Sequence, residues 1–317
     1  MCIRDRSNII VMPRHITVAF PGQGSQFVGM LDHLPEGFIN NFKDDIRESL
    51  EFDILDIIKN GSEEKLNKTS ITQPAILLTS YLEYKFMLDK LNIEPDLLCG
   101  HSLGEYTALV AAQALTLRDA LRVVHKRGLY MEESLSGSMF AILNTDMKII
   151  DDCCQKASFK SNKIVSPANI NSSKQVVIAG EDEAVELAIE YLKNNGAKKC
   201  IRLNVSVPSH CELMYEAATK LSTILDEIKI NNCEYELIHN LDAKKSNDFS
   251  SIKNKLILQL TKPVRWSDIM THVKTKNGIF IECGPKNILS GLAKANDIDN
   301  IYSTSSNTFI SEMGKIL

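Results

Sequence analysis

The sequence predicts a mixed α/β fold with a large and a small subdomain, and three observations support this. Strand-like and helix-like segments alternate between residues 16 and 133. Residues 97–106 read as a short apolar strand, a turn between two glycines and the start of a helix. Residues 138–203 follow a β-α-β-β-α-β order. We therefore expect an α/β-hydrolase-like large subdomain with a parallel sheet and a nucleophile elbow, plus an inserted ferredoxin-like small subdomain.

This interpretation places the large subdomain in residues 12–137 and 204–317 and the small subdomain in residues 138–203. Residues 1–11 are expected to be an extension outside the fold, disordered or not native, with Met12 as the natural start. The chain has 317 residues, of which 44% are hydrophobic and 24% charged, and these fractions are ordinary for a globular enzyme.

The individual elements follow from hydrophobic spacing and from helix and strand breakers. Gly61 is expected to stop one helix, and Pro74 fits the first turn of the next. No motif is recognised beyond about residue 295. In the large subdomain we expect strands at 16–20, 97–99, 234–239 and 279–282, and helices at 37–60, 73–91, from the elbow to about 115, 117–133 and 212–228. In the small subdomain we expect strands at 139–143, 164–169, 175–179 and 199–203, and helices at 146–158 and 182–195.

Charge and composition exclude several classes of protein. The formal net charge is −4 without a basic stripe, which argues against nucleic-acid binding. No apolar run approaches the ~20 residues of a membrane helix. The eight cysteines form no C-x-x-C pair. We expect reduced thiols in a cytoplasmic protein, with no disulfide framework and no metal site.

Gly100-His-Ser-Leu-Gly-Glu-Tyr106 is the most informative motif. Its G-x-S-x-G core lies between a strand and a helix, as in a nucleophile elbow, which would hold the Ser102 hydroxyl above the sheet. Small residues are required where so sharp a turn brings backbones together. The alternative is a capping box, in which Ser102 starts the helix and Glu105 closes it.

The loop Pro21-Gly-Gln-Gly-Ser-Gln26 follows the first strand. It is neither G-x-G-x-x-G nor a Walker loop, because Phe27 replaces the third glycine and no Walker lysine is present. One interpretation is a plain tight turn. The other is that the N–H groups of Gln23 and Leu103 together form an oxyanion hole beside the elbow.

A serine hydroxyl needs a base to become a nucleophile, and seven histidines are available. His210 stands out because Pro208-Ser-His210 ends an apolar run just after the small subdomain. The alternative is an ordinary loop histidine. Since no aspartate lies in an obvious triad context, a backbone or amide carbonyl is the candidate for orienting the base.

Taken together, the motifs resemble the malonyl-CoA:acyl carrier protein transacylase family, which is related to the acyltransferase domains of polyketide synthases. The resemblance runs from about Met12 to Leu292, with the motifs in the same order. The motifs that carry it are Phe20-Pro-Gly-Gln-Gly-Ser-Gln26, Gly100-His-Ser-Leu-Gly-Glu-Tyr106, Arg127-Gly128, Val205-Ser-Val-Pro-Ser-His210, Gln259 and Glu282-Cys-Gly-Pro285.

The resemblance implies a role for each matched residue. It makes Ser102 the nucleophile and His210 the general base. It makes the N–H groups of Gln23 and Leu103 the oxyanion hole. It also implies that the backbone carbonyl of Gln259 orients the histidine.

For Arg127 the resemblance implies that the guanidinium holds the free carboxylate of the malonyl group, in agreement with the bidentate chemistry of arginine. On spacing alone, a solvated helix arginine is the alternative. The chain departs from many relatives at Glu132, where they have Gln, which affects a contact at the pocket edge. Asn169 and Asn171 match a stretch near the thioester arm, and we assign them no role.

The implied activity is transfer of malonyl from malonyl-CoA to the phosphopantetheine thiol of acyl carrier protein, by a ping-pong route that supplies fatty-acid synthesis. No cofactor is expected, and we expect a cytoplasmic monomer. A trans-acting polyketide acyltransferase shares this chemistry. The sequence is also compatible with a serine hydrolase of acyl thioesters or with a non-catalytic docking module for carrier protein.

Overall fold

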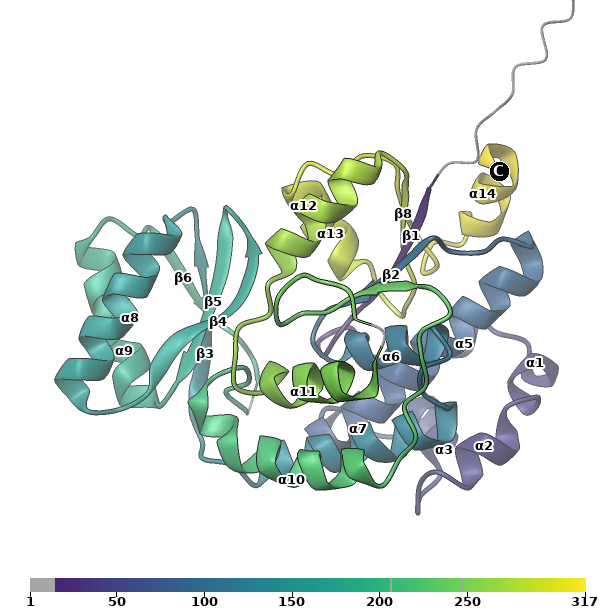
Figure 1. Ribbon diagram of the computed structural model, residues 1–317, viewed down its shortest axis with the longest axis horizontal. Helices are drawn as coiled ribbons and strands as arrows, with labels where there is room; N and C mark the ends of the chain where they lie inside the picture. Colours follow the sequence, from purple (N-terminus) through teal and green to yellow (C-terminus); the bar gives the residue numbers. More distant parts are fainter. Residues whose placement is uncertain (1–14, 206, 247) are drawn as a thin grey trace, which may run out of the picture.

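The computed structural model describes residues 15–205, 207–246 and 248–317. The predicted extension at residues 1–11 lies outside the described residues. Two bodies are visible in Figure 1: a larger one built on a parallel sheet, and a smaller one with its own sheet and two helices.

The larger sheet has five strands in the order β7-β2-β1-β8-β9, and every neighbouring pair is parallel. The central strands are buried along their whole length, as expected when helices cover both faces of a parallel sheet. The carboxyl ends of β1, β2, β7 and β8 therefore lie at one edge. The strands are β1 (Ile16–Phe20), β2 (Leu97–Gly100), β7 (Glu236–Ile238), β8 (Ile279–Glu282) and β9 (Ile301–Ser303).

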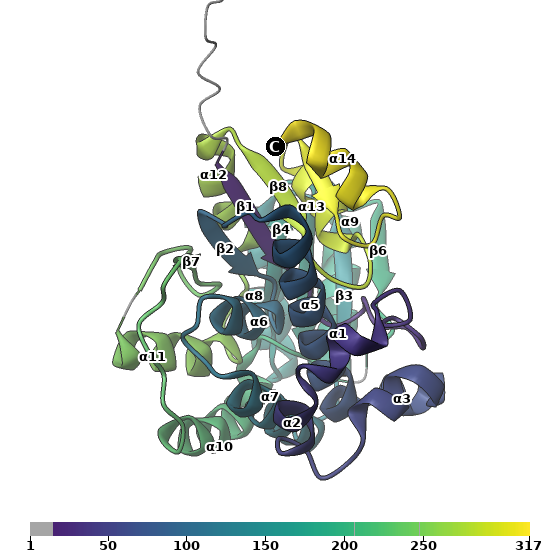
Figure 2. The same cartoon turned by 90° about the vertical axis from the view of Figure 1, so that its right-hand side faces the viewer.

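Helices surround this sheet, and the long helix α5 runs along it with α14 packed on it (Figure 2). No helix within the described ranges combines the length and apolar character that crossing a membrane requires. The helices are α1 (Glu36–Asn40), α2 (Lys43–Arg47), α3 (Ile54–Asn60), α4 (Glu63–Leu66), α5 (Thr69–Leu91), α6 (Gly104–Ala111), α7 (Leu117–Glu132), α10 (Tyr215–Asp226), α11 (Phe249–Gln259), α12 (Trp266–Lys276), α13 (Ile288–Ala295) and α14 (Phe309–Ile316), with a 3-10 turn η1 (Glu212–Met214) before α10.

Two sequence predictions for the first helices are wrong. The single helix expected over 37–60 is three short helices, and the last of them starts after Asp53, whose side chain caps it by accepting a hydrogen bond from the Asp56 N–H. Helix α5 begins at Thr69, so Pro74 lies in its second turn. Proline has no N–H for the Ser70 carbonyl, and His125 Nδ1 contacts that oxygen instead at 2.8 Å.

The smaller sheet is antiparallel, with the order β4-β5-β3-β6, and it packs against α8 and α9 around its own apolar core (Figure 1). Two backbone hydrogen bonds of 2.9 Å join it to the larger body, from Ile170 N to Val264 O and from Val264 N to Ala168 O. The elements are β3 (Ser138–Leu143), α8 (Met147–Ser161), β4 (Val165–Ser172), β5 (Gln175–Gly180), α9 (Asp182–Asn194) and β6 (Lys199–Arg202).

The last part of the chain, which carries no recognisable motif, folds into β9 and α14. Both belong to the larger body: β9 extends the parallel sheet beside β8, and α14 buries Phe309 and Met313. Helices α11, α12 and α13 were also not predicted. Helix α11 matters most for the site, because it brings Gln259 to the edge of the sheet where β2 ends.

Candidate active site

Ser102 lies on a sharp turn between β2 and α6, at a left-handed backbone conformation with φ of 53°. The turn depends on two close backbone approaches. A Cβ on Gly100 would lie 2.0 Å from the Gly104 carbonyl, and one on Gly104 would lie 2.0 Å from Phe20 O. Both distances are far too short for any side chain. The segment therefore has the strand-turn-helix geometry of a nucleophile elbow.

His210 reaches Ser102 across 108 residues of sequence, with 2.8 Å between Ser102 Oγ and His210 Nε2. The other ring nitrogen, Nδ1, lies 2.6 Å from the backbone oxygen of Gln259. Gln259 is the last residue of α11, where helix carbonyls have no intrahelical donor. That carbonyl accepts a hydrogen bond from the Nδ1–H group, so Nε2 is left as the acceptor for the Ser102 hydroxyl.

The environment keeps His210 neutral. Burial, followed by the positive charge of Arg127, lowers the pKa of His210 to about 3. The hydrogen bond to Gln259 acts in the opposite direction. An unprotonated imidazole at neutral pH has the lone pair that a general base needs.

The neighbouring histidine has a different partner. His101 Nε2 lies 2.9 Å from Asn171 Oδ1, and His125 contacts the Ser70 carbonyl. Within the described part of the chain, His210 is the one histidine hydrogen-bonded to Ser102.

The capping-box interpretation of the elbow is wrong. Ser102 N donates to Asn240 Oδ1 at 2.7 Å, and the Glu105 carboxylate accepts from Asn240 N at 3.0 Å. Glu105 therefore turns toward the residues that follow β7 and does not close the helix start. No side-chain cap is formed on α6.

Arg127 is buried on α7, with 1% of its surface exposed, so the solvated-arginine interpretation is wrong. Its Nη1 donates to Gln73 Oε1 at 2.8 Å, and its Nη2 donates to Gln259 Oε1 at 3.1 Å. The same Nη2 lies 3.5 Å from Ser102 Oγ. A permanent positive charge thus sits beside the serine hydroxyl, in a place suited to an anionic group.

The loop after β1 packs on the elbow. A Cβ on Gly22 would lie 2.7 Å from His101 O and 3.8 Å from Leu103 N, so the next residue, Gln23, comes close to the turn. Within residues 15–205, 207–246 and 248–317, neither the Gln23 nor the Leu103 N–H has a protein acceptor. Both are therefore available to an oxyanion.

A cavity of about 650 Å³ opens beside this loop, between the elbow and β4. Gln23 and His101 line one side of it, and Asn169, Asn171 and Lys174 line the other. Glu132 does not line this cavity, and its carboxylate accepts from Ser70 N at 2.8 Å. The cavity reaches the elbow through His101, the residue before Ser102.

Three residues of the site were missed from the sequence: Gln73, Glu105 and Asn240. Asn240 joins the elbow to the end of β7, since its side chain accepts from Ser102 N and donates to Gly100 O at 2.6 Å. Glu105 carried a signal, because it is an acidic residue among the apolar residues of α6. Gln73 and Asn240 carried none, since amides are common on any helix or loop.

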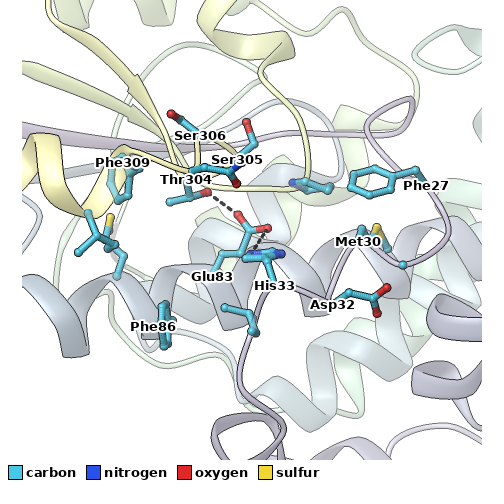
Figure 3. A pocket seen from close by; sticks show the side chains of 16 residues that line it. Phe27, Met30, Asp32, His33, Glu83, Phe86, Thr304, Ser305, Ser306 and Phe309 are labelled. Atoms are coloured by element: carbon cyan, nitrogen blue, oxygen red, sulfur yellow. Dashed lines mark hydrogen bonds and ion pairs between the residues drawn. The ribbon is translucent and has the colours of Figure 1, made fainter.

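A second cavity, of about 460 Å³, lies elsewhere, between α5, the loop after β1 and the segment that leads to α14 (Figure 3). Glu83 and His33 point toward each other in it, with 3.5 Å between Glu83 Oε1 and His33 Nε2, and Thr304 donates to the other carboxylate oxygen. Burial raises the pKa of Glu83 to about 8. Ser102, His210 and Arg127 line neither this cavity nor the first one, but the first is also lined by Gln23 and His101.

Metal-ligating side chains are not gathered anywhere in the described ranges, which contain no group of three or more His, Cys, Asp or Glu residues placed to hold an ion.

The chain is similar to several known proteins. The malonyl CoA-acyl carrier protein transacylase of Haemophilus influenzae is 39% identical over 290 residues, covering 89% of this chain and 92% of that protein. The solved structure of the transacylase of the same name from Coxiella burnetii is 37% identical with a TM-score of 0.91, covering 96% of this chain and 98% of that chain.

A third match is a type II PKS acyl-carrier protein in complex with its malonyl-transacylase, at 36% identity and a TM-score of 0.89, covering 95% of this chain and 99% of that one. The family described as "Acyl transferase domain" matches residues 17–303, a range that includes the elbow and His210. The chain is therefore an acyltransferase and belongs to the acyl transferase family.

Proposed function

We propose that the protein transfers the malonyl group of malonyl-CoA to the phosphopantetheine thiol of acyl carrier protein, supplying fatty-acid synthesis, through a malonyl-serine intermediate. One observation carries this proposal. The buried guanidinium of Arg127 lies 3.5 Å from the hydroxyl of Ser102, which is itself hydrogen-bonded to His210. A serine paired with a base performs acyl transfer, and the adjacent fixed cation selects an acyl group with a free carboxylate.

In the first half-reaction the malonyl carboxylate binds Arg127. His210 Nε2 takes the Ser102 proton as Ser102 Oγ bonds to the thioester carbonyl carbon. The N–H groups of Gln23 and Leu103 hold the resulting oxyanion. The carbon–sulfur bond then breaks, His210 returns its proton to the sulfur, and CoA leaves.

In the second half-reaction the carrier-protein thiol takes the place of CoA. His210 accepts the thiol proton as sulfur bonds to the acyl carbon, and the proton passes to Ser102 Oγ when the ester bond breaks. Gln259 O holds His210 in the tautomer that both halves need. Side chains and backbone groups supply every step of this route, so it requires no metal or redox cofactor.

The proposal also covers the architecture of the two subdomains, the oligomeric state and the cellular location. The strand order β4-β5-β3-β6 fits a ferredoxin-like small subdomain at 138–203, and the elbow fits a hydrolase-like body in 12–137 and 204–317. The proposal includes a monomeric protein. The seven cysteines in the described ranges are free thiols, which suits the reducing cytoplasm.

Two features separate the rival functions: the arginine beside the nucleophile and the molecule that accepts the acyl group. A hydrolase of acyl thioesters needs no buried arginine beside its nucleophile, whereas a malonyl transferase uses one. The relative solved with a type II PKS carrier protein supports carrier protein as the acceptor here. Offering fatty-acid and polyketide carrier proteins in competition would identify the pathway.

Intact-mass spectrometry after mixing with malonyl-CoA, acetyl-CoA or methylmalonyl-CoA tests the proposal. We expect a malonyl adduct, mapped to Ser102 by peptide analysis, that is lost when holo acyl carrier protein is added and reappears on the carrier. Little acetyl adduct should form. Release of malonate as fast as malonyl reaches the carrier would favour a hydrolase instead.

A further inference from the structure

We propose that Glu105 is a positioning residue for acyl selectivity, because it holds the Gln259 side chain in the orientation that fixes Arg127 beside Ser102. This inference rests on the proposed function and deepens it. It concerns a residue that does not touch the substrate, and it assigns a second task to Gln259 beyond its backbone contact with His210.

Glu105 is fully buried near the start of α6, and protein groups surround its carboxylate. Its Oε2 accepts from Gln259 Nε2 at 2.7 Å and from Asn240 N at 3.0 Å. Its Oε1 lies 2.6 Å from His239 Nδ1. A buried carboxylate with three such partners is a rigid anchor, since breaking any one contact leaves a desolvated polar group.

The anchor determines which way the Gln259 amide faces. Its Nε2 donates to Glu105 Oε2 and to Ser102 O at 3.0 Å, which leaves Oε1 toward Arg127 Nη2 at 3.1 Å. Rotating the amide by half a turn would set its oxygen against the carboxylate and its N–H groups against the guanidinium. Glu105 makes the shortest of the three hydrogen bonds from Gln259 Nε2, ahead of those to Ser102 O and Asn240 Oδ1, and all three favour the orientation in which Gln259 accepts from Arg127.

Charge gives a second reason. Arg127 is buried with an amide oxygen on each side, from Gln73 and Gln259, and amides carry no net charge. The Glu105 carboxylate, one amide away, supplies opposite charge to the same buried network. Burial lowers the pKa of Arg127, and Tyr106, followed by the charge of Glu105, acts against that shift. The guanidinium is thus held charged and in place before the acyl carboxylate arrives.

The test compares Glu105→Ala with Glu105→Gln. A glutamine retains an acceptor for Gln259 and Asn240, whereas alanine removes it. We expect Glu105→Ala to lower the ratio of malonyl to acetyl kcat/KM about tenfold or more, the size expected from losing a hydrogen bond to a charged group. Glu105→Gln keeps the acceptor but removes the charge, so its ratio should lie between that of Glu105→Ala and that of wild type.

Glu282→Ala is the matched control. Glu282 is also fully buried, and its carboxylate accepts from Leu289 N at 2.9 Å and Ser290 N at 2.7 Å. Its loss should lower stability without changing the malonyl to acetyl ratio. If Glu105→Ala also reduces both thioesters by one factor, Glu105 is only structural and the inference is overturned.

Two further measurements keep the test decisive. Should Glu105→Ala fail to fold, Glu105→Asp withdraws the carboxylate by one methylene, and an unchanged ratio in that variant contradicts the inference. The wild-type malonyl adduct at Ser102 is measured in parallel. Its absence would reject the proposed function, whereas its presence with an unchanged ratio would reject only the role of Glu105.

Discussion

Glu105 and Glu83 are both buried glutamates on helices of the larger body, yet their surroundings differ. Glu105 contacts Gln259, Asn240 and His239, which together serve both of its oxygens. Glu83 has a hydrogen bond from Thr304 to one oxygen, while the other has no hydrogen-bond partner in the described residues, lies 3.5 Å from His33 Nε2 and faces a cavity (Figure 3).

The difference shows that burial alone does not decide what a carboxylate does. Donors around Glu105 let its carboxylate connect the start of α6 with Gln259 and with the residues that follow β7. With few donors, burial raises the pKa of Glu83 to about 8, so it holds a proton at neutral pH. We therefore expect changes in the elbow region to alter chemistry, and changes at Glu83 to alter stability.

The largest effect is expected at Ser102. Ser102→Ala should abolish the malonyl adduct while the fold remains intact, because the elbow backbone does not depend on the hydroxyl. Intact-mass spectrometry and circular dichroism check the two parts. A covalent malonyl group that still accumulates on this variant would mean that another residue is the nucleophile.

His210→Ala comes next. Removing a general base typically costs about 10²–10⁴-fold in rate, so stopped-flow acylation by malonyl-CoA should slow by that amount. His101→Ala and His125→Ala are the controls, since their rings contact Asn171 and the Ser70 carbonyl and not Ser102. A larger chemical defect at His101 than at His210 would reverse the assignment.

Arg127→Ala should change the choice of acyl group. Removing one partner of a buried charge pair typically costs about 3–5 kcal/mol, or roughly two to four decades in rate. We expect kcat/KM for malonyl-CoA to fall steeply while that for acetyl-CoA holds or rises. An equal fall for both thioesters would show that Arg127 supports the fold and does not read the carboxylate.

The smallest effect on activity is expected at Glu83, where the change is in stability. Glu83 is ionised in the unfolded chain above its ordinary pKa of 4.5 but protonated in the folded chain up to about pH 8. The stabilisation that the Glu83 carboxyl group provides is therefore fully present below pH 4.5. The free energy of unfolding should fall as the pH rises between these values, by on the order of a few kcal/mol.

Glu83→Gln removes this titration, so its stability should fall less than that of wild type between pH 5.5 and 8.5, measured by urea unfolding. His33, Glu282 and Cys283 face or lie near the same carboxyl group and are present in both proteins. Identical pH profiles for the two proteins would show that Glu83 keeps an ordinary pKa.

Local sequence predicted the elements whose cause is local. The elbow at Gly100–Gly104 was predictable because two glycines permit backbone contacts that no side chain allows. The bounds of the strands and helices of the small subdomain were predicted to within a few residues, because their causes are also local. The helix expected over 37–60 was wrong because its interruption at Asp53 depends on a cap, and capping residues occur at many non-terminal positions.

The sequence by itself also identified Ser102, His210, Gln23, Leu103, Arg127 and Gln259 as the candidate site, through motifs in a family-like order. Only the tertiary structure decided how they meet, and it added Glu105, Asn240 and Gln73.

The physical reason lies in the parallel sheet. It sets the carboxyl ends of β1, β2 and β7 at one edge, so loops 108 to 157 residues apart come into hydrogen-bonding distance. A carboxylate or amide does not reveal its partner in the sequence, because the partner is chosen by the packing of strands far apart along the chain.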